Sequence, residues 1–171
     1  MLKRFLVLTL LISVQEIIIA QNEEKEANLK AAFIYNFTRY IDWNTDSVGN
    51  NFVIGIIGTS PVADALNEIA RTNTVNNKKI IIRTYDRPED ITFCDILFIP
   101  QNLPFPLESI LKKAGNGVLT VGEEEGFAKK GTALNFIVVN EKLKFEANLK
   151  SLEAAGLKAG SQLLKLAIII N

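Results

Sequence analysis

Residues 52–58, with the sequence Phe-Val-Ile-Gly-Ile-Ile-Gly, decide the fold class. The side chains are apolar and mostly β-branched, which predicts a strand buried on both faces of a sheet. Thr59, Ser60 and Pro61 follow directly. Ser60 is suited to cap a helix, and Pro61 is suited to its first position. We therefore expect a helix up to about Arg71, and with it a strand–turn–helix unit of the α/β kind.

The same alternation continues in both directions along the chain. Before this unit, apolar side chains three and four residues apart predict a helix over residues 25–42. After it, the pattern predicts strands at 79–85, 95–99, 117–122, 133–139 and 143–147, and helices at 106–114, 148–155 and 160–168. Residues 140–142 form a short polar loop that joins two of these strands as a hairpin. The sequence therefore predicts a single α/β domain with a mixed, mostly parallel sheet flanked by helices and a late antiparallel hairpin.

Residues 1–20 have the layout of a secretory signal peptide. Two basic residues precede an apolar run from Phe5 to Val14, and Ala20 is a small residue at the expected cleavage point. The run is shorter than the roughly 20 residues that span a bilayer. We expect export to the periplasm and removal of this segment; the alternative is an uncleaved anchor. Residues 21–28 are polar and predict a flexible start, with the domain over residues 29–171.

The residue types that the chain lacks exclude several functions. It has no histidine, so a histidine-activated nucleophile and His-ligated zinc are not available. Its one cysteine, Cys94, lies in an apolar strand-like run and is expected to be a buried, unreactive thiol. Residues 1–20 hold two of the 19 basic and one of the 19 acidic side chains, so the remainder has a net charge of −1 and no bulk attraction to nucleic acid. We expect no catalytic residue, no cofactor and no metal site.

Two polar stretches have residue types that could bind a ligand. The turn at residues 58–61 lacks the glycine and lysine pattern of a phosphate-binding loop and is interpreted as a capped turn. Glu123–Glu125 does not match a calcium-binding loop, and adjacent loop carboxylates usually point apart into water. The candidates for a small-molecule pocket, near the ends of parallel strands, are Tyr35, Trp43 and Ser60. The alternative for Trp43 is packing at the edge of the core.

Two further segments carry a resemblance to a known family. The first runs from Lys30 to Trp43 and the second from Leu119 to Ala167, with the strand at residues 52–58 between them. In this order they resemble the YfiR family of exported bacterial proteins. The matching residues are Lys30, Ala31, Phe33, Tyr35, Asn36, Phe37 and Trp43, and later Asn135, Phe136, Phe145, Asn148, Ala155, Gly156, Leu157, Ser161, Leu163, Leu164, Leu166 and Ala167.

The resemblance implies a non-catalytic periplasmic repressor. Such a protein binds the periplasmic sensor domain of a membrane-bound diguanylate cyclase and holds it inactive, which controls cyclic-di-GMP, biofilm formation and motility. An outer-membrane lipoprotein relieves the repression, and a homodimer is also implied. The chain departs from the pattern in two ways. Its single cysteine excludes the disulfide-based redox sensitivity of the best-known member, and Gln162 stands where a basic residue is common.

The hairpin is the predicted contact with such a partner, because a hairpin exposes an edge with mixed polar and apolar side chains. The candidate residues are Asn140, Glu141, Lys144, Phe145, Glu146 and Asn148. The alternative function is a periplasmic small-molecule sensor that acts on a histidine kinase or another receptor, with its pocket at the three residues named above.

Overall fold

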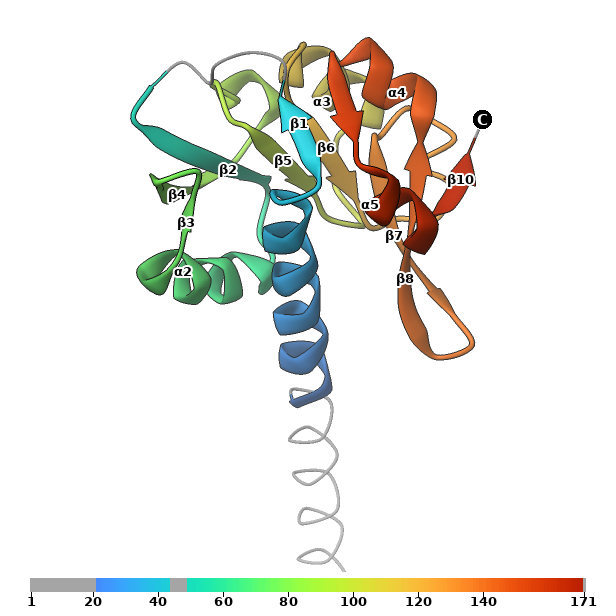
Figure 1. Cartoon of the computed structure of the whole chain (residues 1–171), viewed down its shortest axis with the longest axis horizontal. Helices are drawn as coiled ribbons and strands as arrows, with labels where there is room; N and C mark the ends of the chain where they lie inside the picture. Colours follow the sequence, from blue (N-terminus) through green and yellow to red (C-terminus); the bar gives the residue numbers. More distant parts are fainter. Residues whose placement is uncertain (1–20, 44–48, 171) are drawn as a thin grey trace, which may run out of the picture.

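The structure is a computed structural model that describes residues 21–43 and 49–170. Within these residues, eight strands form one mixed sheet in the order β10-β8-β7-β6-β5-β2-β4-β3 (Figure 1). The parallel strands are β2 (Asn51–Ile57), β4 (Lys78–Tyr85), β5 (Ile96–Ile99), β6 (Leu119–Gly122) and β7 (Leu134–Val139). The strands of opposite direction are β3 (Thr74–Val75), β8 (Lys142–Asn148) and β10 (Ile168–Ile170). The predicted α/β domain, with its mostly parallel sheet and late hairpin, is confirmed.

Helices enclose the sheet from both faces. One core cluster joins the sheet to the N-terminal helix (residues 21–37), α2 (Val62–Thr72), α4 (Leu149–Ala154) and α5 (Ser161–Leu166). The second cluster joins the opposite face to α3 (Leu107–Ala114). A 3₁₀ turn, η1 (Pro88–Asp90), precedes β5, and a separate antiparallel pair is formed by β1 (Ile41–Trp43) and β9 (Leu157–Ala159).

The stretch at residues 52–58 is buried on both faces, as predicted. Phe52, Ile54 and Ile56 belong to the first core cluster, whereas Val53 and Ile57 belong to the second. Gly55 lies between the latter two, and a Cβ there would approach the Tyr85 ring to 2.7 Å. A side chain at this position would displace the core, which explains the glycine inside a strand.

The first helix differs from the prediction at both ends. Residues 21–28, expected to be a flexible start, are helical, and the helix ends at residue 37 instead of 42. The Thr38 hydroxyl donates to the carbonyl of Tyr35 at 2.6 Å and closes the last turn. Residues 41–43 then pair with β9, and this pairing overrides the helical spacing of the apolar side chains. The predicted signal peptide, residues 1–20, lies outside the described residues.

The predicted last helix is also divided. Residues 160–168 contain α5, which ends at Leu166, and the chain then enters β10 beside β8. Three successive isoleucines, residues 168–170, favour the strand because β-branched side chains fit a pleated sheet better than a helix. The apolar run alone does not distinguish a continued helix from a strand, because its period is ambiguous over so few residues.

Candidate functional site

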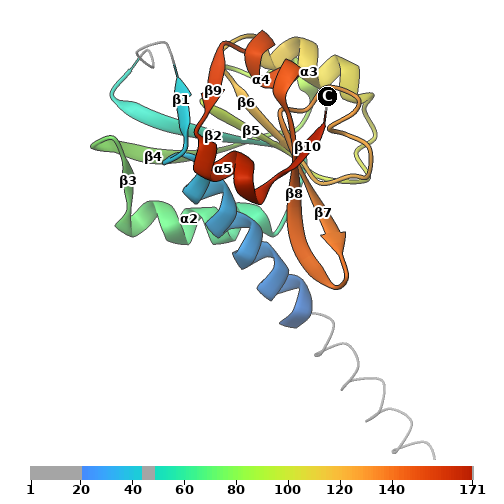
Figure 2. The ribbon, with the colours of Figure 1, turned by 45° about the vertical axis from the view of Figure 1, so that its right-hand side comes forward.

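The outer half of the β7–β8 hairpin extends beyond the neighbouring strands (Figures 1 and 2). β6 pairs with β7 only at Leu134 and Asn135, and β10 pairs with β8 only at residues 146–148. Residues 136–145 therefore form a two-stranded ribbon without another strand beside it among the described residues. The tight turn at residues 140–141 has φ angles of 51° and 59°, which a type I′ turn requires.

Aromatic side chains fix the base of this hairpin to the N-terminal helix. Phe136 and Phe145 lie opposite each other on the two strands. They pack against Phe33 and Phe37, with ring centroids 5.1 to 6.0 Å apart. Such aromatic pairs contribute about 0.5–1.5 kcal/mol each beyond the area they bury. The base of the ribbon is therefore fixed to the N-terminal helix.

The tip of the hairpin continues the same apolar face into solvent. Val138 is two residues beyond Phe136, on the same face of β7, and is 65% exposed. Leu29, one helical turn before Phe33, is 46% exposed. An apolar surface on a protruding element is typical of a protein-docking site. Lys144, on the other face of the ribbon, is exposed as well.

The six predicted partner residues do not form one surface. Asn140, Glu141 and Lys144 are exposed at the tip. The other three, Phe145, Glu146 and Asn148, make contacts within the fold. Val138 and Leu29 are not among the residues predicted from the sequence. Apolar side chains alternate along β7 from Phe136 up to the turn. This alternation continues beyond Asn135, the last residue of β7 that pairs with β6, and could have indicated Val138.

Phe145 and Asn148 are buried and cannot reach a partner, which corrects their assignment. Phe145 is 2% exposed within the aromatic cluster. Asn148 caps α4, because its Oδ1 accepts from the backbone N–H of Ser151 at 3.0 Å, and its Nδ2 donates to the carbonyl of Ala128 at 2.7 Å. Glu146 is half-buried and accepts a hydrogen bond from Asn135 at 3.1 Å.

A second polar site lies at the carboxyl ends of β2, β5 and β6. Chain connections leave β2 and β5 in opposite directions, and such switch points are where α/β sheets usually bind ligands. Here Lys30 of the N-terminal helix contacts Glu26 at 2.6 Å and Glu123 at 2.7 Å. The side chains of Lys30 and Glu123 are only 11% and 8% exposed. The other oxygen of Glu123 accepts from the backbone N–H of Gln101 at 3.1 Å.

The electrostatics of this site favour a charged lysine. Burial alone would lower the pKa of Lys30, but hydrogen bonds and charge from Glu123 and Glu26 outweigh it, so the pKa is raised. A pocket of about 340 Å³ remains beside the pair, and Ser60 lines it. Glu123 was expected to be solvated; the structure instead makes it the internal partner of Lys30.

Tyr35, Trp43 and Ser60 do not meet in one pocket. The Tyr35 hydroxyl donates to the carbonyl of Thr74 in β3 at 3.4 Å. Trp43 packs edge-on against Phe52 at the amino end of β2, with ring centroids 5.4 Å apart. Ser60 follows the carboxyl end of β2, about 20 Å away at 3.3 Å per strand residue. There its hydroxyl accepts from the N–H of Val62 at 3.2 Å, so it helps to start α2.

Two buried titratable groups lie at the amino ends of the strands. Burial, reinforced by the charge of Asp95, raises the pKa of the Cys94 thiol to about 12, so the thiol is unreactive as predicted. Burial also raises the pKa of Asp95, although its carboxylate accepts from the N–H of Val53 at 2.7 Å. Within residues 21–43 and 49–170, no group of acidic or cysteine side chains could hold a metal ion.

The fold defines the class: a single α/β domain with a mixed sheet, from which one hairpin extends with an exposed apolar side chain. The chain belongs to the YfiR/HmsC-like family, because the family model of that description matches residues 27–168. The matched range includes the aromatic cluster, the Lys30–Glu123 pair and the hairpin. The family is one of periplasmic regulators. A search of curated proteins finds no match to the chain. Across the part of the chain that the structure describes, no helix is long and apolar enough to cross a membrane.

Proposed function

We propose that the protein is a non-catalytic periplasmic regulator that binds the periplasmic sensor domain of a membrane-bound diguanylate cyclase and represses it. Membership in the YfiR/HmsC-like family supports the regulatory role. One observation supports the mode of action. The hairpin tip carries Val138, an apolar side chain that is 65% exposed on a ribbon fixed at its base. Transfer of this apolar side chain out of water lowers the free energy, and on an exposed tip this happens only when a partner covers it.

Repression follows if the protein binds only one conformation of the sensor domain. To move a two-state cyclase from mostly active to mostly inactive takes about 5.5 kcal/mol of differential binding. An interface of standard size, about 800 Å² on each partner, supplies that amount. The proposed contact covers both faces of the tip: Val138 on one face, Lys144 on the other, and Asn140 and Glu141 at the turn, with Leu29 of the N-terminal helix.

The same proposal places the protein in the periplasm after removal of residues 1–20 at Ala20. A homodimer is the proposed assembly. An outer-membrane lipoprotein that competes for the same surface would release the cyclase. Such competition needs no chemistry, cofactor or metal on the part of the regulator.

The test is cyclase activity in membranes that contain the full-length enzyme, with the exported protein added on the periplasmic side. We expect synthesis of cyclic-di-GMP to fall as the protein is added. The variant Lys144→Glu should need more protein for the same inhibition. Lys112→Glu, a charge reversal at another exposed lysine, on α3, is the matched control. Undiminished synthesis with every form would contradict the proposal.

A second candidate function is a small-molecule sensor that acts on a histidine kinase or another receptor. One observation favours it: the pocket of about 340 Å³ at the switch point of the sheet, lined by Ser60, Lys30 and Gln101. Thermal-shift measurements with a metabolite panel test it. A ligand that stabilises the wild type should lose its effect in Gln101→Trp, which fills the pocket from an exposed position.

A further inference from the structure

The eight-stranded sheet ends on one side at β10, a short strand made of three isoleucines, residues 168–170. β10 pairs with β8 through residues 146–148, and among the residues that the structure describes no other strand pairs with it. Figure 1 shows β10 at the margin of the molecule. An open edge of this kind presents backbone N–H and C=O groups to which a further strand can be added.

Apolar side chains are exposed along this edge. Ile168 and Ile169 are 40% and 39% exposed. Leu166, two residues before β10, is 70% exposed, and Leu149, which directly follows β8, is 37% exposed. These four are half of the eight large apolar side chains that are exposed within the described ranges. Such a concentration of exposed apolar side chains is typical of an interaction surface.

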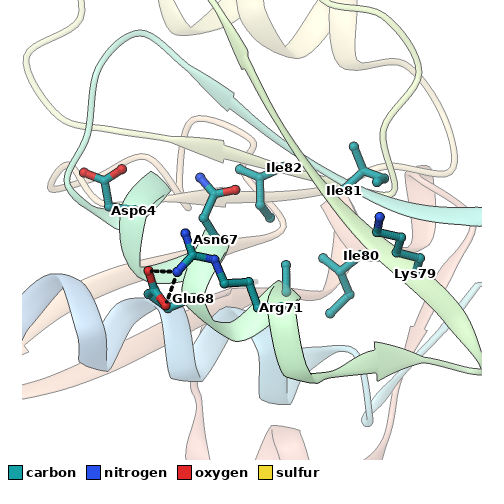
Figure 3. A pocket seen from close by; sticks show the side chains of 9 residues that line it. Asp64, Asn67, Glu68, Arg71, Lys79, Ile80, Ile81 and Ile82 are labelled. Atoms are coloured by element: carbon teal, nitrogen blue, oxygen red, sulfur yellow. Dashed lines mark hydrogen bonds and ion pairs between the residues drawn. The ribbon is translucent and has the colours of Figure 1, made fainter.

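β10 has none of the usual protection against pairing with another chain. Proteins protect open edges with charged side chains, proline or a bulge, whereas β10 is made of isoleucine alone. The opposite end of the sheet differs. There β3 is only two residues long, and the groove of about 710 Å³ between β4 and α2 is lined by charged side chains of both signs, Asp64, Glu68, Arg71 and Lys79 (Figure 3). β10 is therefore the edge that is suited to burial.

The isoleucines of β10 lie on both faces of the sheet. Ile169 is the neighbour of Ala147, which belongs to the first core cluster, so its side chain lies on the face that α4 and α5 cover. Ile168 and Ile170 lie on the opposite face, because successive side chains of a strand alternate. An added strand would therefore contact apolar side chains on both faces.

A second copy of the chain fits this edge as an antiparallel strand. A twofold axis through Ile169 sets Ile169 opposite its own copy and Ile168 opposite Ile170. Each of the six side chains then meets an isoleucine, and neither strand contains a charged residue. Contacts of this kind between β-branched side chains of neighbouring strands stabilise a sheet. The hydrogen-bond ladder is regular, because both copies present the same residue at the axis.

The same axis brings the two exposed leucines into reciprocal positions. α5 lies at the start of β10, and α4 lies toward its end (Figures 1 and 2). Because the two β10 strands run in opposite directions, Leu166 of one copy approaches the end of the sheet where Leu149 of the second copy lies. Both helices belong to the first core cluster and so cover the same face. A twofold interface requires this reciprocity, which favours a second copy over a strand of a different protein.

We propose that β10 is the surface through which two copies of the protein form a dimer, by antiparallel pairing of their β10 strands into one continuous sheet. The assignment rests on the homodimer of the proposed function and supplies its interface. It does not depend on the cyclase or on the hairpin tip. Burial of the apolar side chains supplies the affinity. The contact is short, so we expect dissociation in the micromolar range, as for other small interfaces.

The test is sedimentation equilibrium of the exported protein without any cyclase. We expect the wild type to dimerise as its concentration rises. Ile169→Lys places two like charges at the axis and should weaken dimerisation at least about tenfold. Phe93→Lys, at an apolar side chain that is 49% exposed and outside this edge, is the matched control. An equal mixture of Ile169→Lys and Ile169→Glu should dimerise more strongly than either variant alone, because opposite charges then meet at the axis.

Cross-linking tests the register of the two strands without relying on charge. Cys94 is buried, so a short bismaleimide reacts with a cysteine introduced at an exposed position instead. Ile169→Cys should form a covalent dimer, because each residue lies opposite its own copy. Phe93→Cys should remain monomeric under the same conditions. The cross-linking result decides the register if Ile169→Lys does not fold.

The possible failures are distinguishable. A protein that stays monomeric up to about 1 mM overturns the β10 interface and the homodimer together. A wild-type dimer that Ile169→Lys leaves intact, or that Ile169→Cys does not cross-link, overturns the β10 interface alone. A monomeric protein whose Ile169→Lys variant no longer inhibits the cyclase would identify the sensor domain as the occupant of this edge, and would overturn the proposal too.

Discussion

The base and the tip of the β7–β8 hairpin share the same two strands but differ in what covers them. At the base, Phe136 and Phe145 are buried against the N-terminal helix. At the tip, Val138 continues the same face of β7 and is 65% exposed. A buried side chain contributes its transfer free energy to folding, whereas an exposed one contributes only when a partner covers it. We therefore expect the base to determine stability and the tip to determine affinity.

The largest effect is expected at the base. Phe145→Ala removes a ring from the aromatic cluster and leaves a cavity, so the free energy of unfolding should fall by about 3–5 kcal/mol. Urea denaturation monitored by circular dichroism measures it. Val138→Ala, two positions beyond the cluster, should change the same quantity by less than about 0.5 kcal/mol. Equal losses in the two variants would mean that base and tip do not differ as described.

The buried ion pair between Lys30 and Glu123 should have a smaller effect. Glu123→Gln leaves the buried Lys30 with only Glu26, which is half exposed. Breaking a buried pair costs about 3–5 kcal/mol when no partner remains, so with Glu26 still present we expect a loss of about 2 kcal/mol. Glu68→Gln, in the exposed pair with Arg71, is the matched control and should cost almost nothing. The same denaturation experiment distinguishes the two.

The fold could be predicted from the sequence where the local pattern and the tertiary environment agree. The buried strand at residues 52–58 and the hairpin are such cases. The strands at residues 41–43 and 168–170 could not be predicted, because three residues carry no period of their own and depend on β9 and β8 as partners. β1 pairs with a strand far away in the sequence, and α4, β9 and α5 lie between β8 and β10, so neither pairing can be recognised from the local sequence.

The candidate site was predictable only in part, for a related reason. The loop of the hairpin was identified, but Phe145 and Asn148 were assigned to a surface that does not contain them. A strand pattern gives the alternation of side chains without saying which face meets the core. Lys30 was noted only as a family landmark. Its pairing with Glu123, 93 residues later, depends on how the helix crosses the sheet.

The contribution of Lys30 should also depend on pH. The pKa of Lys30 in the folded protein is raised above its ordinary value of 10.5. The stabilisation is therefore fully present below pH 10.5 and is lost as the pH rises beyond it through the folded-state pKa. We expect the difference in unfolding free energy between the wild type and Lys30→Met to shrink at strongly alkaline pH. A constant difference would show that the charge of Lys30 does not contribute.

One change at the tip should alter stability, through the backbone alone. Glu141 has a φ angle of 59°, which glycine adopts more easily than a residue with a side chain. Glu141→Gly creates the Asn-Gly turn preferred in two-residue hairpins and should raise the free energy of unfolding by about 1 kcal/mol. Glu141→Gln removes the charge but keeps the strain, and serves as the control. A loss of stability in Glu141→Gly would mean that the Glu141 side chain supports the turn.

Whether the hairpin tip binds the sensor domain is tested most directly by calorimetric titration of the exported protein with the purified periplasmic domain of the cyclase. Val138→Asp should weaken binding about 30-fold, equivalent to about 2 kcal/mol, while the melting temperature stays unchanged. Phe93→Asp replaces another exposed apolar side chain, 49% exposed and outside the hairpin, and should bind like the wild type. Wild-type affinity of Val138→Asp, or an equal loss in Phe93→Asp, would contradict the assignment of the hairpin tip as the binding surface.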